Sequence, residues 1–309
     1  MKFKKCTAVL VMIVAIITIF AGCGGSRPSG ETAVTEALQE SAGEERPARV
    51  AAVSRSLAEL WLLAGGELAG VTEDASDLPG LTEETAVIGT VSKPGIEAIL
   101  ALDPDLVILS AELTAQQELR EELERAGVAC MPIEINGFDD YRTVMATLTD
   151  MTGREDLFEK NVTGVGEEIQ NILGGASARI AENEAEERTF LAMRVSATKN
   201  KTLKKDYFAC EIFSDFGLKN IAEDNSALDE LNLEAVIAAD PDYIFVIPQG
   251  KENEAQQSYR EAFADHAVWG ELRAVKSGRV FILPKDLFQY KPNARWGEAY
   301  GYIDELLQK

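Results

Sequence analysis

The chain is short of histidine and of positive charge, and it lacks the short motifs of several enzyme classes. Its single histidine, His266, argues against a carrier of bare metal ions, which needs a cluster of histidine and carboxylate ligands. Lysine and arginine number 30 against 52 aspartates and glutamates, and the formal charge of −22 argues against non-specific binding to nucleic acid. No Gly-x-Ser-x-Gly, Gly-x-x-x-x-Gly-Lys-Ser/Thr or His-Glu-x-x-His motif occurs. Acidic residues are abundant, but no pattern places two of them across a cleft, so we expect neither catalysis nor a resident cofactor.

The first residues have the pattern of an export signal. Three lysines within residues 2–5 precede an apolar run over 8–21, which falls short of the about 20 residues of a comfortable membrane-spanning helix. The ending at 20–23 is similar to a bacterial lipobox, with Phe20 where leucine is usual, and Cys23 would then carry the lipid and become the mature N-terminus. We expect a lipoprotein signal peptide at 1–22 and an extracytoplasmic protein anchored by its lipid to the cell membrane. An uncleaved anchor would hold the protein at the same membrane face.

A segment with almost no large apolar residues follows. Residues 24–47 consist mainly of Gly, Ser, Pro, Glu and Ala, which cannot bury enough surface to offset the entropy cost of ordering. We therefore expect the lipidated cysteine and a flexible tether at 23–47. Beyond the tether, Cys130 and Cys210 are expected to be buried free thiols, with a disulfide between them as the alternative.

One pattern occurs twice in the rest of the chain. Residues 95–107 (GIEAILALDPDLV) return as 232–244 (NLEAVIAADPDYI), and the offset of 137 residues is too long for a solenoid repeat. In each copy a short helix opens near a glutamate, Asp-Pro-Asp ends it, and an apolar run typical of a buried parallel strand follows. The duplication predicts two similar lobes with a ligand held between them.

Alternating strand and helix patterns extend this prediction over the folded part. We expect an α/β fold in which each lobe has a central, mostly parallel sheet flanked by helices, and a single long helix joins the lobes. The predicted boundaries are an N-terminal lobe at 48–152, a linking helix at 153–187 and a C-terminal lobe at 188–309. Strands are expected at 49–53, 68–71, 86–88, 106–109, 128–133, 189–195, 243–247 and 279–283, and helices at 57–64, 114–125, 139–151, 154–184, 206–216, 252–264 and 294–307. Trp61 lies on an apolar helical stripe and is expected in the core.

Several segments, taken together and in order, resemble one family. The segments 49–54, 57–60, 70–72, 89–107 and 274–280 are similar to those of the substrate-binding proteins of bacterial ABC importers for iron–siderophore complexes, haem and cobalamin. The resemblance covers nearly all of 49–309 and implies two α/β lobes, one long joining helix, a ligand in the cleft and little hinge motion. It also places Trp269 in a packing motif of the core.

The resemblance gives the repeated glutamates a role. In the family, one glutamate at a helix start of each lobe docks onto arginines of the permease, and the matching residues are Glu97 and Glu234. Paired charges at two distant points would fix the orientation of docking and speed the encounter. By itself, each glutamate would only indicate the start of a helix.

The loops that hold the ligand follow from a general rule. In open α/β sheets ligands lie beyond the carboxyl ends of the strands, and this rule and the resemblance select the same loops. These loops are rich in basic and aromatic residues in an otherwise acidic chain, which suits a large anionic complex. The predicted ligand-binding residues are Arg55, Lys93, Tyr207, Tyr290, Lys291, Arg295 and Trp296. Arg194, late in its strand, ranks below them, and the lysines at 199–205 are as readily explained as solvent-facing.

A ferric siderophore is the expected ligand, delivered by a tethered monomer to an ABC permease and its ATPase. Haem and cobalamin stay open as alternatives. Haem normally needs an axial histidine or tyrosine, and because His266 lies beside Trp269 and away from the selected loops, Tyr207 or Tyr290 would have to serve. Cobalamin asks for aromatic walls and few charges. A surface sensor without an importer is a further alternative, which the neighbouring genes would separate from an importer component.

Overall fold

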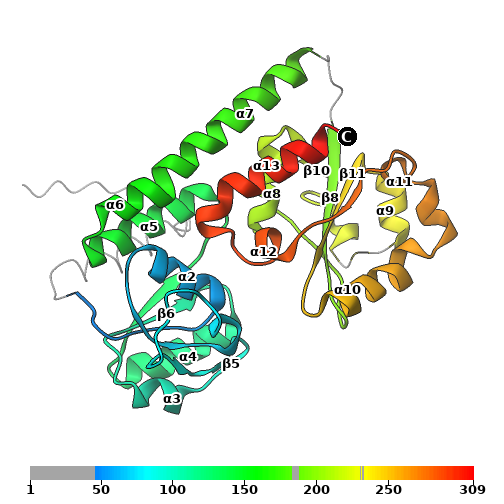
Figure 1. Cartoon of the computed structure of the whole chain (residues 1–309). Helices are drawn as coiled ribbons and strands as arrows, with labels where there is room; N and C mark the ends of the chain where they lie inside the picture. Colours follow the sequence, from blue (N-terminus) through cyan, green and yellow to red (C-terminus); the bar gives the residue numbers. More distant parts are fainter. Residues whose placement is uncertain (1–45, 183–187, 230, 232) are drawn as a thin grey trace, which may run out of the picture. The chain divides into compact units, whose positions relative to one another are not determined.

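The computed structural model describes residues 46–182, 188–229, 231 and 233–309, which contain two parallel sheets (Figure 1). The predicted signal peptide, Cys23 and all but the last two residues of the predicted tether lie outside the described residues. Within the described part of the chain, no helix is long and apolar enough to cross a membrane.

The first sheet has five strands in the order β3-β2-β1-β6-β7, all parallel. Its central strands β1 and β6 are buried along their whole length, as strands covered by helices on both faces must be. An antiparallel pair, β4 with β5, precedes α3. The elements are β1 (Val50–Ala52), α2 (Arg55–Leu63), β2 (Leu68–Val71), β3 (Ala86–Val87), β4 (Gly89–Thr90), β5 (Lys93–Pro94), α3 (Ile96–Ala101), β6 (Leu106–Ser110), α4 (Thr114–Arg125), β7 (Ala129–Ile133) and α5 (Phe138–Thr152).

The second sheet has the order β10-β8-β11-β12, again parallel, with the short β9 antiparallel on β8. The predicted arrangement of two α/β lobes is therefore confirmed. The strands β9 and β10 were not predicted because two or three residues are too few to show a period. The elements are β8 (Arg188–Val195), β9 (Lys201–Thr202), α8 (Phe208–Asp215), β10 (Leu218–Asn220), α9 (Leu233–Ala239), β11 (Tyr243–Pro248), α10 (Glu252–Tyr259), α11 (Arg273–Lys276), β12 (Val280–Ile282), α12 (Lys285–Phe288) and α13 (Trp296–Leu307).

Strand β8 separates two apolar layers, because successive side chains of a strand point to opposite faces. Leu191, Met193 and Val195 belong to one buried cluster, which also contains Trp269. On the other face, Phe190 meets the ring of Phe213 in α8 edge-on, with the centroids 5.2 Å apart. The side chains at 192 and 194 therefore share the face of α8. Trp61 and Trp269 are buried, as predicted.

The predicted long helix is one continuous run with a local change of pitch. It consists of α6 (Glu155–Phe158), a π-helical turn at Glu159–Thr163 and α7 (Gly164–Glu182). Asn161 in the π turn is buried. Its side-chain amide donates to the backbone carbonyl of Leu63 (2.9 Å), and its backbone carbonyl accepts from the hydroxyl of Tyr141 (3.0 Å). Helix α13 lies along α7 (Figure 1), and Arg179 pairs with Asp304 between them. The end of the predicted linking helix, 183–187, lies outside the described residues.

The repeated Asp-Pro-Asp has the same structural role in both lobes. Its first aspartate adopts a left-handed backbone conformation in each copy, with φ 49° at Asp103 and 40° at Asp240. Its second aspartate holds the start of the neighbouring central strand. Asp105 Oδ2 accepts from the backbone N–H groups of Ala48 and Arg49, both at 2.8 Å.

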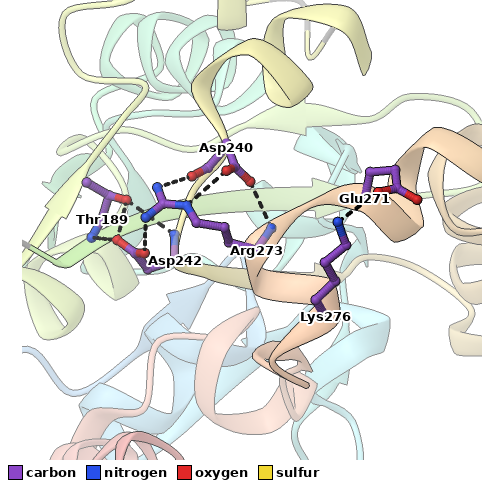
Figure 2. A network of polar contacts seen from close by, with 6 residues as sticks. All are labelled: Thr189, Asp240, Asp242, Glu271, Arg273 and Lys276. Atoms are coloured by element: carbon purple, nitrogen blue, oxygen red, sulfur yellow. Dashed lines mark hydrogen bonds and ion pairs between the residues drawn. The ribbon is translucent and has the colours of Figure 1, made fainter.

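In the second lobe the same motif has an added clamp. Asp242 Oδ2 accepts from the backbone N–H (2.9 Å) and the hydroxyl (2.8 Å) of Thr189, at the start of β8. Figure 2 shows the guanidinium of Arg273 between the two aspartates, with Nε 2.9 Å from Asp240 Oδ2 and a terminal nitrogen 2.8 Å from Asp242 Oδ1. The duplicated sequence therefore marks a structural device that ends a helix and ties two parallel strands together.

Candidate ligand-binding site

Three of the seven predicted ligand-binding residues meet around one buried aromatic ring. Phe208 is the first residue of α8 and is 1% exposed. Its ring centroid lies 5.1 Å from that of Tyr207, 5.6 Å from that of Trp296 and 5.3 Å from the ammonium of Lys291. The structure thus gathers residues from two separate segments of the second lobe at one point.

Lys291 extends this cluster to the first lobe. Its ammonium donates to the backbone carbonyl of Ile135, two residues after β7, and lies 3.5 Å from a carboxylate oxygen of Glu112, two residues after β6. Its backbone N–H bonds the hydroxyl of Ser56, in the first turn of α2 (3.3 Å). These partners all follow the carboxyl ends of β1, β6 and β7, where the rule for open sheets places a ligand.

The electrostatic setting of Lys291 is that of a desolvated cation held by carboxylates. Burial lowers the pKa of its ammonium, whereas Glu112 first, and then Glu134 and Asp140, raise it. Glu112 was not among the predicted site residues because one glutamate among so many carries no signal of its own. Its place directly after a central strand was the only available indication.

Tyr207 is fixed by a hydrogen bond within its own lobe. Its hydroxyl donates to the backbone carbonyl of Phe288 at 2.7 Å. Burial raises the pKa of this phenol, the positive charge of Arg194 opposes that rise, and Glu112 adds to it. The phenol therefore stays protonated, with its proton directed at a carbonyl. Tyr290 is half-buried, and its backbone N–H bonds the carbonyl of Lys285 at 3.0 Å.

The two predicted arginines are paired with carboxylates close to them in the chain. Arg55 donates to the backbone carbonyl of Asp74 (2.7 Å) and pairs with Asp77. Arg295 forms a two-pronged pair with Glu298, at 2.7 and 2.8 Å, and this hydrogen bonding raises the pKa of its guanidinium.

Most of the basic residues in these loops are therefore already paired with carboxylates of the chain itself. Lys204 pairs with Asp229 at 2.6 Å, and Lys205 approaches Glu223 at 3.8 Å. Lys93, on β5, is exposed. A count of basic residues in a loop could not show this, because the pairing depends on where the carboxylates lie in space.

Trp296, predicted as a wall for the ligand, is fully buried at 0% exposure. Its ring lies against those of Phe138 (6.0 Å) and Tyr141 (6.3 Å) of α5 as well as Phe208 of α8. It opens α13, the helix that packs along α7, so its side chain points into the contact between helices. The indole packs the core beneath the site and presents no surface to a ligand in this structure.

Glu97 and Glu234 occupy equivalent places in the two lobes. Each lies in the first turn of the repeated helix, α3 or α9, and each is exposed. Leu100, one turn further along α3, is also exposed, at 38%. Both glutamates are thus on the surface, as docking requires.

The ring contacts around Phe208 involve neither of the two thiols nor the histidine. Cys130 and Cys210 are free, and burial raises the pKa of the half-buried Cys130 thiol to about 11, which makes it a poor nucleophile. His266 is exposed, with Nε2 3.1 Å from the carbonyl of Glu261. Among the described residues, no group of three or more histidine, cysteine, aspartate or glutamate side chains could hold a metal ion.

A groove of about 620 Å³ lies elsewhere, between α5 and the linking helix. Its walls include Phe138, Arg142, Phe158, Val162 and Glu167, and none of the predicted ligand-binding residues. We place the candidate site at the carboxyl ends of the strands instead, because charged and aromatic groups of both lobes meet there.

Comparison with known proteins agrees with the observed fold. The profile of the family described as periplasmic binding protein matches residues 50–287. The putative ABC transporter substrate-binding lipoprotein YhfQ of Bacillus subtilis is 22% identical over 98% of this chain and 97% of its own length. The Fe(3+)-citrate-binding protein YfmC of the same organism is 22% identical over 92% and 90%. The crystal structure of Staphylococcus aureus IsdE complexed with heme superposes with a TM-score of 0.73 at 17% identity, covering 86% of this chain and all of that one.

Proposed function

The chain belongs to the periplasmic binding protein family, and on this premise we propose that it captures an iron complex, a ferric siderophore first of all, and delivers it to an ABC permease and its ATPase. The ligand binds between the lobes at 48–152 and 188–309, which the segment at 153–187 joins. The role is binding, with no catalytic step, and the protein acts as a monomer.

The observation that carries the proposal is the convergence around Phe208. An aromatic pair at the start of α8 and a desolvated ammonium lie where the carboxyl ends of β1, β6 and β7 face the second lobe. The half-buried ring of Tyr207 supplies apolar surface to a large complex, and a desolvated cation attracts the acidic oxygens of that complex. Closure of the lobes on the ligand would shift a pre-existing equilibrium by the ligand's preference for the closed form.

The anchor and the docking residues complete the proposal. Cys23 carries the lipid that holds the protein outside the cytoplasm at the cell membrane. Glu97 and Glu234 meet arginines of the permease, one from each lobe. A ligand sensor without an importer would use the same site, and neighbouring permease and ATPase genes would favour import.

A fluorescence titration tests the binding role. The mature chain with Cys23→Ser, so that no lipid is added, is titrated with ferric citrate, a ferric catecholate, a ferric hydroxamate, haem and cyanocobalamin. Trp296 reports directly, because its ring lies against Phe208. Saturable quenching by a ferric complex at sub-micromolar concentration supports the proposal. Saturation by haem or cobalamin alone reassigns the ligand within the family, and silence from all five contradicts an iron-complex carrier.

A further inference from the structure

One cation near the candidate site differs from every other half-buried cation of the described residues. Arg194, the penultimate residue of β8, is half-buried, and its guanidinium has no hydrogen bond or ion pair within the described part of the chain. The other half-buried cations there each bond a carboxylate or a backbone carbonyl; they are Arg55, Arg120, Arg188, Lys204, Lys285, Lys291 and Arg295.

Its position directs it toward the site. In register, Arg194 lies opposite Ile247 of β11 and Lys201 of β9, at the carboxyl edge of the second sheet. The alternation along β8 places it on the face of α8, with Phe190. It is close enough to Tyr207, at the start of α8, for its charge to oppose the rise in the pKa of that phenol.

The guanidinium of Arg194 is available to a ligand. None of its nitrogens is among the enclosed side-chain atoms without a hydrogen bond, so solvent still reaches them and a ligand can too. A guanidinium offers five donors in a planar fork, a shape that matches the two oxygens of a carboxylate. The chain itself supplies carboxylates to Arg55, Arg295 and Lys291 but not to Arg194.

We propose that Arg194 is the principal anchor for a carboxylate of the bound ligand, with the half-buried ring of Tyr207 forming the adjacent wall. This inference rests on the proposed function and narrows it: the ligand is an iron complex that carries carboxylates, such as a carboxylate-type chelate or the propionates of haem. A neutral hydroxamate complex gains nothing from this residue.

The test compares Arg194→Gln and Arg194→Lys with Lys201→Gln, a control that removes an exposed cation directly opposite Arg194 in the register. Each unlipidated protein is titrated with ferric citrate, haem and ferrichrome, a neutral trihydroxamate complex. Because a hydrogen-bonded ion pair is lost, Arg194→Gln should weaken binding of the carboxylate ligand by roughly 10- to 100-fold. Arg194→Lys keeps the charge but not the planar fork, so its affinity should lie between those of the wild type and Arg194→Gln. Lys201→Gln should bind with the affinity of the wild type. Whether citrate or haem shows the loss identifies the source of the carboxylate.

Thermal unfolding of the unliganded variants supplies an independent reading. An anchor that lacks a partner in the protein contributes no stability, so Arg194→Gln should melt at or above the wild-type temperature. A lower melting temperature would assign Arg194 a structural role and overturn the inference, as would equal ligand affinity in Arg194→Gln and Lys201→Gln. Binding of ferrichrome alone by the wild type would also overturn it while leaving the proposed function intact. Failure of the wild type to bind any of the three would contradict the proposed function itself.

Discussion

Lys291 and Glu112 join the two lobes across the candidate site, with the ammonium 3.5 Å from the carboxylate. Their side chains are 21% and 37% exposed, so the pair is partly shielded from solvent. An acidic ligand that reaches Lys291 meets Glu112 as well. The pair therefore makes Glu112 a competitor for the cation that the ligand would use.

The substitution Glu112→Gln should tighten binding of an anionic iron complex. It removes a like charge facing the ligand and frees the ammonium, which for a partly exposed pair is worth about 0.5–1 kcal/mol, or roughly 2- to 5-fold in affinity. Titration of the variant beside Glu121→Gln, an exposed glutamate of α4, separates the local effect from the change in net charge. Weaker binding by Glu112→Gln would show that the carboxylate supports the site rather than competing in it.

The double substitution of Glu97 and Glu234 by alanine should abolish uptake and leave ligand affinity unchanged. Both residues are exposed in first helical turns and lie outside the cluster around Phe208, so they should act only on the permease. Uptake of radioactive iron in cells measures the first effect, and titration of the purified protein measures the second. The matched control replaces Glu121 and Glu252, two other exposed glutamates, by alanine. Normal uptake by the Glu97 and Glu234 variant would remove the docking assignment.

Asp242→Asn should destabilise the protein by about 1–3 kcal/mol, because Asp242 accepts two hydrogen bonds from Thr189 and pairs with Arg273. Asp105→Asn should lower the free energy of unfolding by less, because Asp105 is exposed and accepts only from backbone N–H groups. Urea unfolding gives both free energies. Equal losses in the two variants would mean that the Arg273 clamp contributes nothing.

Glu211→Gln should stabilise the protein near neutral pH and lose that advantage in acid. Glu211 accepts from the backbone N–H of Phe138 at 3.1 Å, and a Cβ at Gly137 would come within 2.0 Å of its carboxylate, so the approach is close. Burial raises the pKa of Glu211 above its ordinary 4.5, and Asp215, Asp140 and Asp139 raise it further.

The sign of this pH dependence follows from linkage. The folded wild type takes up a proton at higher pH than the unfolded chain, so its stability rises relative to that of Glu211→Gln as the pH falls through the raised pKa of Glu211 toward 4.5. A glutamine at this position can still accept a hydrogen bond from the N–H of Phe138, whereas an alanine cannot. Glu211→Ala should therefore be less stable than Glu211→Gln at every pH. Unfolding free energies at pH 8, 6.5 and 5 measure the difference. A constant gap between wild type and Glu211→Gln would show that Glu211 is ionised alike in both states.

Cys23→Ser should release the protein from the membrane fraction and abolish labelling by radioactive palmitate. The thioether and amide links to lipid both depend on this cysteine. Cys6→Ser, within the predicted signal, is the control and should leave anchoring and labelling unchanged. Retention of the Cys23→Ser protein in the membrane would point to an uncleaved signal as the anchor.

Much of the fold could be predicted because its signals are local. The helix at Thr114–Arg125 and the strand at Leu68–Val71 have the predicted bounds, since an amphipathic period and an apolar run that follows a helix-ending glycine pair need no distant partner. The site was harder to predict. Phe208 and the carbonyl of Ile135 hold Lys291, but a buried phenylalanine and a backbone carbonyl have no distinctive sequence pattern.

By itself, the sequence determined the two lobes, the repeated Asp-Pro-Asp and the surface glutamates, because each depends on order and spacing along the chain. Only the tertiary structure decided which cations are available to a ligand. Arg55, Arg295 and Lys291 each pair with a carboxylate of the chain, and Trp296 is enclosed by helices. Arg194 has no such partner among the described residues. The physical reason is that desolvation and pairing depend on distances through space, which the order of residues does not record.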